Sequence, residues 1–404
     1  MTQVEAIIIG NGIMARVTSH LMAKEGVFKK ALIIGSEALP TASTQNQVWL
    51  QSGLIYPLET EKGKREAELC IRFGRRLNEM RLKSMTERFG IMAVASEQEA
   101  WRKIDFQIRN GFPQYDHILR PAEVERLLGR DFAQSAHYPE GTCFFKTPDQ
   151  PFDEGGLLGF CRDSLRSPSS GFSSITGNAT LRKSQVARNG YSLVVNGEEY
   201  DPGMLFVMAG VSTKQLLAPL GIEQHINIHA RRCVLMRAPI ITDLSADLFV
   251  DMMSHLSVNV VTNGLGEKMC LFGDVQFSLV PDLTQAMTDR DVTDDDKSKF
   301  LENLCQPQFF PQLRSRLIPL MKDNANFSVC YKTECDGHLP WIFPSAKFAP
   351  EFPNIFVAGP GKATLAWYAA QELLKLAKIN IQTGLERPIV LEEPSYQPLW
   401  IDQK

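Results

Sequence analysis

The first 35 residues alternate between short apolar runs and a helical pattern. Residues 4–9 form an apolar run of the kind found in buried parallel strands. Apolar side chains then recur at helical spacing over residues 13–26, and residues 31–34 form a second buried run. Two such runs, joined through a turn and a helix, predict a β-turn-α-β unit.

The rest of the chain adds a long helix, a second group of strands and a closing strand. The pattern predicts an amphipathic helix over residues 64–89 and a strand at 91–95. Several strands within residues 226–280 are typical of an antiparallel sheet, which indicates a second domain. A strand at 354–359 leads through a glycine-rich turn into a final helix. The expected fold class is therefore α/β, with a Rossmann-like domain and an antiparallel-sheet α+β domain.

Length and composition set the broad class. A chain of 404 residues is too long for one compact core, so two domains are expected. The formal net charge of -3 gives no reason to expect nucleic acid or an anionic membrane as a partner. No apolar run reaches the length of about 18 residues that a membrane span requires. No signal peptide is recognisable either, and a cytoplasmic location is expected. The 8 cysteines include no C-x-x-C pair, so no metal site is predicted.

The stretch GNGIMA at residues 10–15 approaches the Gly-x-Gly-x-x-Gly loop of dinucleotide-binding proteins. Gly10 permits the tight turn, Gly12 allows the backbone to approach a pyrophosphate, and Ala15 is small enough to pack helix against strand. The amino end of the following helix would then face phosphate. A turn that binds no ligand is the alternative.

The acidic residue that usually follows this loop type is missing. Gly35 stands where an Asp or Glu would hold the ribose hydroxyls. Ser36 or Glu37 is close enough along the chain to take that role. These residues alone leave the identity of the cofactor open.

Three distant stretches carry a further resemblance. They are GNGIMA at 10–15, ASTQNQVWLQSGLIYP at 42–57 and NIFVAGPGKATLAWYAAQELL at 354–374. In this order they resemble the FAD-dependent oxidoreductases of the D-amino-acid oxidase type, the family of glycine oxidase, sarcosine oxidase and L-2-hydroxyglutarate oxidase. Residues 145–165 and 205–217 resemble further parts of that family, so the resemblance touches nearly the full length.

The resemblance implies a Rossmann-like FAD-binding domain that is split along the sequence. That domain would consist of residues 1–90, 145–220 and 325–385. The substrate domain would consist of residues 91–144 and 221–324, and residues 386–404 would form a C-terminal tail.

The resemblance also implies which residues contact FAD. Contacts to the phosphates, adenine, ribose and flavin edge would come from Gly10, Gly12, Ala15, Glu37, Ser43, Thr44, Asn46, Ala179, Ala209 and Gly210. Contacts to the pyrimidine end of the flavin would come from Gly359, Pro360, Gly361, Lys362, Ala363 and Thr364, where a helix start stabilises negative charge on reduced flavin. Cys330 lies about where sarcosine oxidase carries the cysteine that links covalently to its flavin. A buried core cysteine is the alternative.

Candidates for substrate contact and catalysis follow from the same resemblance. The substrate contacts would be Trp49, Tyr56 and Trp341. The catalytic candidates are Gln51, Lys332 and His338. Relatives that oxidise hydroxy acids tend to carry histidine where Gln51 stands, and a glutamine cannot act as a general base.

Further side chains bear on the substrate and the electron acceptor. His338 or His255 could take a proton from a hydroxyl, although a packed or surface histidine is the simpler interpretation. Lys332, Arg231 or Arg232 could hold a substrate carboxylate. Lys268 is the lysine nearest to the position at which sarcosine oxidase activates oxygen. Oxygen and another electron acceptor are therefore both open.

The expected function is that of an FAD-dependent oxidase or dehydrogenase. It would oxidise a small amine or amino acid at the C–N bond by hydride transfer to flavin N5. Oxidation of a 2-hydroxy acid is the first alternative, and a non-catalytic FAD-fold binding protein is the second. A nicotinamide dehydrogenase that uses the N-terminal unit alone would leave the glycine-rich turn at 359–364 unexplained.

Overall fold

The computed structural model describes most of the chain. The described residues are 1–36, 49–79, 89–129, 138–151, 159, 161, 163, 165, 171–239, 244–254, 256–262, 268–274, 278–289, 291–304, 317–323, 326–335 and 339–377. Five predicted site residues lie outside them, namely Glu37, Ser43, Thr44, Asn46 and His338. His255 and the predicted tail at 386–404 lie outside them too.

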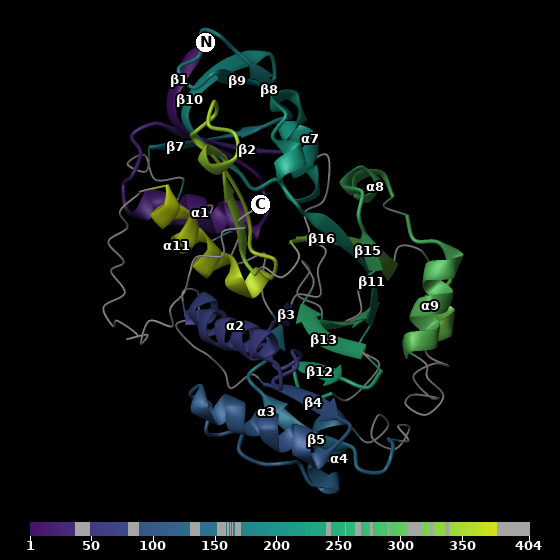
Figure 1. Ribbon diagram of the computed structural model, residues 1–404. Coiled ribbons are helices and arrows are strands. Elements are labelled where there is room, and N and C mark those ends of the chain that lie inside the picture. The colour runs from purple at the N-terminus through teal and green to yellow at the C-terminus, as the bar shows by residue number, and fades with distance from the viewer. Residues whose placement is uncertain are drawn as a thin grey trace.

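The first sheet is mainly parallel and contains the predicted β-turn-α-β unit (Figure 1). Its strand order is β17-β18-β10-β1-β2-β7, and the β8–β9 hairpin is attached to β10. Neighbours from β18 to β7 run parallel, whereas β17 is antiparallel to β18. The strands are β1 (Thr2–Ile9), β2 (Ala31–Gly35), β7 (Phe172–Thr176), β8 (Ala179–Lys183), β9 (Tyr191–Val195), β10 (Glu198–Val207), β17 (Trp341–Pro344) and β18 (Ile355–Gly359).

Both faces of the first sheet are covered, which explains the continuous apolar runs. Ile7 and Ile9 of β1 pack into a core that includes the β8–β9 hairpin. Ala6 and Ile8 pack into a second core with helices α1 (Ile13–Lys24) and α11 (Ala366–Leu376). A strand that is buried on both faces has no polar side to alternate with its apolar side.

The second sheet is mainly antiparallel, as predicted for residues 226–280. Its order is β15-β11-β14-β13-β12-β4-β5, and β16 also pairs with β11 at the register Cys233 opposite Cys330. The β12–β4 pair is parallel. The strands are β4 (Gly90–Val94), β5 (Cys143–Thr147), β11 (His229–Pro239), β12 (Leu248–Asp251), β13 (Leu256–Thr262), β14 (Lys268–Asp274), β15 (Ser278–Val280) and β16 (Phe327–Glu334).

Helices connect and cover the two sheets. Helix α2 (Glu61–Glu79) contributes to the core beneath the first sheet through Cys70 and to a core of the second sheet through Ala67. Of the helix predicted at 64–89, the structure confirms residues 64–79, with the start three residues earlier at Glu61. Residues 80–88 lie outside the described residues, and Phe89 is not helical. The remaining helices are α3 (Glu97–Arg109), α4 (Pro121–Leu128), α7 (Thr213–Leu217), α8 (Leu283–Thr288) and α9 (Asp294–Leu304), with short 3-10 turns η2 (Gly210–Ser212), η3 (Ala218–Leu220), η4 (Glu223–His225), η6 (Ser345–Lys347) and η7 (Ala363–Leu365). A two-stranded sheet joins β3 (Trp49–Leu50) to β6 (Gln150–Pro151).

Two segments expected in the FAD-binding domain pair into the second sheet. They are residues 145–147 in β5 and residues 327–334 in β16. Pairing between strands so far apart in sequence leaves no local periodicity to recognise. The division into two domains at the stated boundaries stays a prediction.

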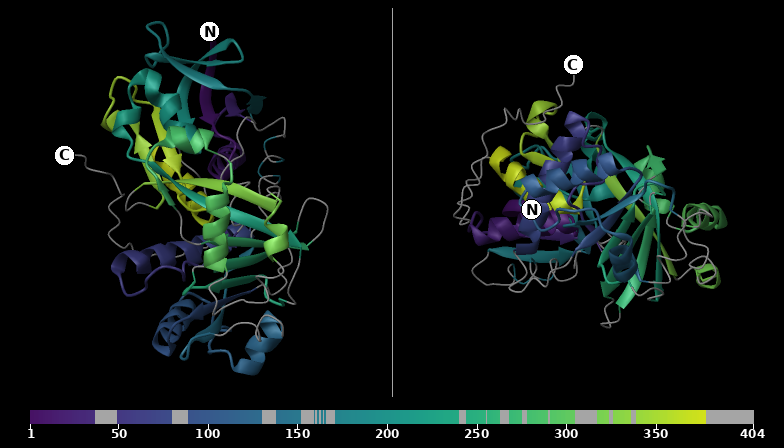
Figure 2. Two further views of the ribbon diagram at one scale, coloured as in Figure 1. Left: turned by 90° about the vertical axis from the view of Figure 1, so that its right-hand side faces the viewer. Right: turned by 90° about the horizontal axis from the view of Figure 1, so that it is seen from below.

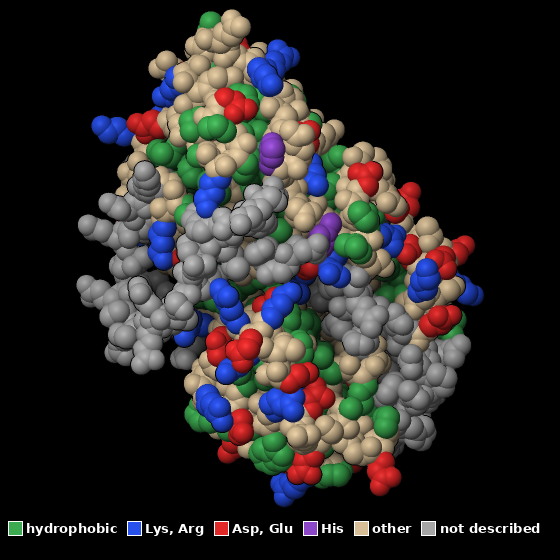
Figure 3. Space-filling model, in the orientation of Figure 1, with side chains coloured by type: hydrophobic (Ala, Val, Ile, Leu, Met, Phe, Trp, Pro, Cys, Tyr) green, Lys and Arg blue, Asp and Glu red, His purple; other side chains and the backbone are tan. Residues whose placement is uncertain are grey.

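The two sheets lie one above the other in Figure 1 and in the left view of Figure 2. On the face shown in Figure 3, described acidic and basic side chains are interspersed. In the part of the chain that the structure describes, no helix has both the length and the apolar character needed to cross a membrane.

Candidate active site

A cavity of about 680 Å³ follows the carboxyl ends of the parallel strands. Its wall includes residues at or just beyond the ends of β18, β10, β1, β2 and β7, in the order in which these strands lie in the sheet. Parallel α/β sheets bind their ligands at this edge. The volume lies within the range of about 300–1,000 Å³ that is typical of ligand and cofactor sites.

The turn after β1 is shaped so that only glycine fits at its first position. Gly10 has a φ of +145°, and a Cβ there would overlap the carbonyl oxygen of Met208 and lie 3.1 Å from the Cβ of Ala15. Gly12 caps the amino end of α1. Together with Ile13 and Met14 it lines the cavity, so this helix end faces the cavity. Ala15 is fully buried and packs in the core rather than in the cavity wall.

Neutral polar groups lie at the end of β2, where dinucleotide-binding proteins usually carry an acidic residue. Gly35 ends β2, and Ser36 follows it in the cavity wall. The Ser36 hydroxyl donates a hydrogen bond of 2.9 Å to Oδ1 of Asn178, which also lines the cavity. Asn11, between the two glycines, accepts a hydrogen bond from Arg16. Ser36 was a candidate from the sequence, whereas Asn11 and Asn178 were missed.

Another part of the cavity wall consists of small and apolar residues. Ala179, Ala209 and Gly210 all line the cavity, as the resemblance implies. They are joined there by Leu216 and Pro219. Small and apolar side chains at this position can accept a flat aromatic ring.

The glycine-rich turn after β18 closes the far end of the cavity. A Cβ at Gly359 would overlap the indole of Trp341, and a Cβ at Gly361 would overlap the side chain of Leu339. Gly361 also has a φ of +64°. Residues 359–363 line the cavity together with Trp341, whereas Thr364 is buried behind them.

Thr364 is in direct contact with Gln51, which belongs to a stretch that the resemblance places near the flavin. The amide of Gln51 donates to Oγ1 of Thr364 at 3.2 Å. Oε1 of Gln51 is buried and has no hydrogen-bond partner among the described residues. A buried amide oxygen without a donor is unfavourable. Gln51, a catalytic candidate from the sequence, is not part of the cavity wall.

Trp49 is held away from any ligand by a buried carboxylate. Its Nε1 donates to Oδ1 of Asp149 at 2.9 Å, and the backbone amide and hydroxyl of Ser52 donate to the same carboxylate at 2.6 Å each. Burial raises the pKa of Asp149, and these hydrogen bonds oppose the rise. Trp49 therefore anchors the loop that contains Gln51, and the cavity wall does not include it. No local pattern in the sequence points to Asp149.

Charged side chains gather at the end of the cavity that is next to the turn at 359–363. Lys332 and Lys362 both line it. Nζ of Lys332 lies 2.5 Å from Oε1 of Glu334, and Nε of Arg231 lies 2.6 Å from Oε2 of the same carboxylate. Burial would raise the pKa of Glu334, but the neighbouring cations lower it to about 2. The carboxylate of Glu334 is therefore ionised and fixed between two cations.

Tyr56 lies next to Lys362. Its ring centroid is 5.7 Å from Nζ of Lys362. Its buried hydroxyl has no hydrogen-bond partner among the described residues, and burial raises its pKa far above the ordinary value. Tyr56 is therefore neutral, and it is not part of the cavity wall as it stands.

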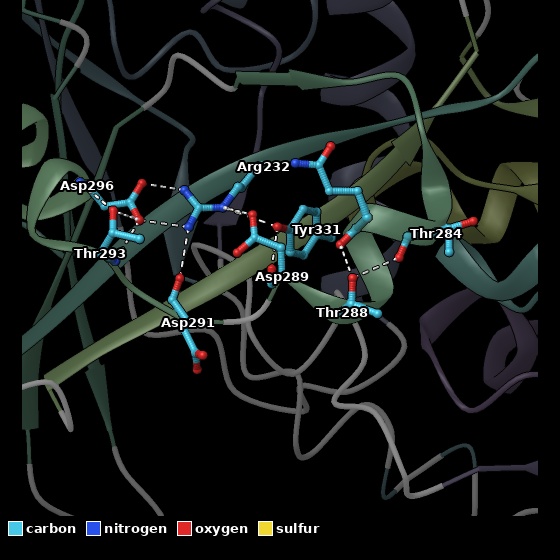
Figure 4. Close-up of polar contacts among 9 residues, drawn as sticks. Arg232, Thr284, Thr288, Asp289, Asp291, Thr293, Asp296 and Tyr331 are labelled. Atoms are coloured by element: carbon cyan, nitrogen blue, oxygen red, sulfur yellow. Dashed lines mark hydrogen bonds and ion pairs between the residues drawn. The ribbon is translucent and has the colours of Figure 1, made fainter.

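Arg232, a candidate for binding a substrate carboxylate, is committed to another partner (Figure 4). Its guanidinium forms two bonds with the Asp296 carboxylate, of 2.5 and 2.8 Å, and its Nε donates to the Tyr331 hydroxyl at 3.2 Å. Tyr331 in turn donates to the carbonyl oxygen of Asp289 at 2.5 Å. Hydrogen bonds from Arg232 lower the pKa of Asp296 to about 2. This network ties α8 and α9 to β11 and β16 beside the cavity, where Tyr331 forms part of the wall.

Cys330 also lies in the cavity wall and is buried. It packs with Cys233, which is directly opposite it on β11. Cys330 is thus within reach of a ligand at this end and is also part of a small apolar cluster.

Comparison with known proteins gives a result at the level of the fold. No protein-family model matches the sequence, and no curated protein matches it significantly. Among solved structures, NikD, an unusual amino acid oxidase essential for nikkomycin biosynthesis, is 14% identical, with a TM-score of 0.67 over 93% of this chain and 94% of that one. Iminodiacetate oxidase from Chelativorans sp. BNC1 is 14% identical, with a TM-score of 0.66 over 95% of this chain and 98% of that one. The chain has the fold of these oxidases.

A third structure of the same fold carries the predicted cofactor. L-α-Glycerophosphate oxidase from Mycoplasma pneumoniae, solved with FAD bound, is 13% identical, with a TM-score of 0.64 over 94% of this chain and 96% of that one. The α/β fold with a Rossmann-like sheet and a second antiparallel sheet, expected from the sequence, is therefore confirmed.

Proposed function

We propose that this protein is an FAD-dependent oxidoreductase that oxidises a small amine or amino acid at its C–N bond. The observation that carries the proposal is the cavity along the carboxyl edge of the parallel sheet. It passes the Gly10–Gly12 turn, and the glycine-rich turn at 359–363 closes it. This fold holds FAD in L-α-glycerophosphate oxidase.

The residues present fit FAD. The amino end of α1 would face the pyrophosphate, and Ser36 with Asn178 would bind the ribose hydroxyls in place of an acidic residue. The turn at 359–363 would hold the pyrimidine end of the flavin, and Gln51 would support that turn through the hydrogen bond from its amide to Thr364. FAD, when bound, accepts the hydride from substrate carbon. The roles of Glu37, Ser43, Thr44 and Asn46 remain part of this proposal.

An amine or amino acid is favoured over a hydroxy acid by the side chains at the flavin end. Two lysines line the cavity there, and no histidine of the described residues does so. A hydroxyl proton is far less acidic than an ammonium proton, so oxidation of an alcohol needs a stronger base than oxidation of an amine does. NikD and iminodiacetate oxidase, which share the fold, are described as amino acid and iminodiacetate oxidases.

The remaining expectations belong to the same proposal. Lys332 and Arg231 share the single carboxylate of Glu334, so the pair of cations would leave positive charge for a substrate carboxylate, with Lys332 the member that lines the cavity. Trp341 and Tyr56 would lie near the substrate. The electrons would pass to oxygen or to another acceptor in the cytoplasm. Cys330 lies at a position from which a covalent flavin link could form, and its alternative is the packing role beside Cys233.

The proposal is tested by anaerobic bleaching of the purified, FAD-loaded protein. Small amines, amino acids and 2-hydroxy acids are added singly, and the loss of flavin absorbance near 450 nm is followed. Bleaching by an amine or amino acid supports the proposal. Bleaching by 2-hydroxy acids alone would replace it with the alternative. Flavin colour that remains in an acid-precipitated pellet, and is lost in Cys330→Ala, would establish the covalent link.

A further inference from the structure

Two lysines share the flavin end of the cavity, but they differ in their partners. Lys332 is bound to Glu334, which is also bound to Arg231. Lys362 is half-buried beside Lys332, and its Nζ lies over the ring of Tyr56. Among the described residues, no carboxylate forms an ion pair with Lys362. One lysine is therefore ion-paired with a carboxylate and the other is not.

This arrangement disfavours the charged form of Lys362. Burial and the adjacent Lys332 ammonium lower the pKa of Lys362 to about 7, and Glu334 opposes the change. Two of the other titratable groups facing it, Tyr56 and Cys70, carry no negative charge near pH 7. Burial keeps Tyr56 neutral and raises the pKa of the Cys70 thiol to about 12. Burial also raises the pKa of Glu66 on α2, and Arg231 on β11 is occupied by Glu334. A lysine beside a second cation is the arrangement that keeps an amine neutral near pH 7.

We propose that the side chain of Lys362 accepts the ammonium proton of the bound substrate, and that the neighbouring Lys332–Glu334–Arg231 group favours the unprotonated form of Lys362 that this step requires. The N–H bond of the substrate ammonium breaks, its electron pair stays on the substrate nitrogen, and the proton forms a new N–H bond on Nζ of Lys362. No electron is transferred in this step. The resulting free amine has the lone pair that loss of hydride from the neighbouring carbon requires. The cationic Lys332 also favours loss of a proton from a bound substrate ammonium.

This inference rests on the proposed function, but its first test needs neither FAD nor a substrate. The protein is treated with cyanate over pH 6–9, and carbamoylation of each lysine is measured by peptide mass spectrometry. Exposed Lys183 serves as the internal reference. Lys362 is expected to react at least about tenfold faster than Lys183 near pH 7, with the ratio falling as the pH rises, because only a neutral amine reacts. Equal pH profiles for the two lysines would overturn the inference.

Two variants test the role of the neighbours in the same assay. Lys332→Met removes the adjacent positive charge, so the labelling profile of Lys362 should move to higher pH. Glu334→Gln removes the opposing negative charge, so the profile should move to lower pH. A profile that stays in place in both variants would contradict the assigned cause.

Kinetics of the FAD-loaded enzyme then test whether Lys362 accepts a proton or acts only as a fixed positive charge. Lys362→Gln and Lys362→Arg should both lower kcat/KM for an amine by about 10²–10⁴-fold at pH 7, the usual contribution of general base catalysis. Raising the pH or adding a small primary amine should restore part of the activity of Lys362→Gln. If Lys362→Arg retains activity, the side chain acts as a cation for the substrate carboxylate and the inference is wrong. Failure to bind FAD would instead refute the proposed function, whatever the labelling shows.

Discussion

Replacing Gly10 by alanine should destabilise the turn after β1 by more than the addition of one methyl group usually does. The residue has a φ of +145°, which side chains other than hydrogen rarely tolerate. The new methyl group would overlap the carbonyl oxygen of Met208. That carbonyl belongs to a residue whose amide is bonded to the carbonyl of Ile9 at 2.8 Å, so it cannot move without loosening β10 from β1.

The expected magnitude has two parts. The backbone conformation costs about 1–3 kcal/mol for a residue with a side chain, and forcing a methyl group into a packed site costs about 1–3 kcal/mol more. Gly197 provides a matched control. It has a φ of +85°, but a Cβ at this position would have no atom within 4 Å, so Gly197→Ala should lose only about 1–2 kcal/mol from backbone strain.

The assay compares both variants with the wild type. Urea unfolding gives the change in stability, and quenching of FAD fluorescence gives the affinity for the cofactor. We expect Gly10→Ala to lose about 2–6 kcal/mol and at least about tenfold in FAD affinity. Gly197→Ala should bind FAD normally. The reasoning is refuted if the two variants are equally stable within about 0.5 kcal/mol and bind FAD equally well.

Three further changes probe other parts of the site. Asp296→Asn should cost about 1–2 kcal/mol at pH 7, because the folded pKa of about 2 lies below the unfolded value. The difference in urea midpoint between Asp296→Asn and the wild type should shrink as the pH falls from 4 towards 2. A difference that stays constant over this range would contradict a stabilising role for the ionised Asp296. Trp49→Phe should lose about 1–3 kcal/mol of unfolding free energy, since Asp149 loses a buried donor; an unchanged melting temperature would argue against this anchor. Ser36→Ala should weaken FAD binding by about fivefold in a fluorescence titration, because the proposed hydrogen bond to the ribose, of about 1 kcal/mol, would be lost. Unchanged affinity would exclude Ser36 from the ribose site.

The parts of the fold that could be predicted are those set by local sequence. Residues 4–9 and 31–34 identify β1 and β2 to within two residues, because strands buried on both faces are apolar throughout. The glycine turns at 10–12 and 359–361 were recognisable because a Cβ at Gly10 would overlap the backbone of Met208, and a Cβ at Gly359 or Gly361 would overlap a neighbouring side chain.

The charged groups of the site could not be predicted, because they depend on pairing between distant strands. Arg231 and Glu334 are 103 residues apart and meet only through the register of β11 with β16. Arg232, the next residue of β11, instead pairs with Asp296 of α9. Neighbouring arginines in one strand point to opposite faces, so the sequence alone could not separate their roles.

The central claim is that the cavity at the carboxyl edge of the parallel sheet binds FAD. The most direct test is the visible absorption spectrum of the purified protein after incubation with FAD and gel filtration, with Gly10→Ala as the control. We predict flavin bands near 370 and 450 nm at about one FAD per chain, and their loss in the control. Wild-type protein that elutes colourless after reconstitution would contradict the claim.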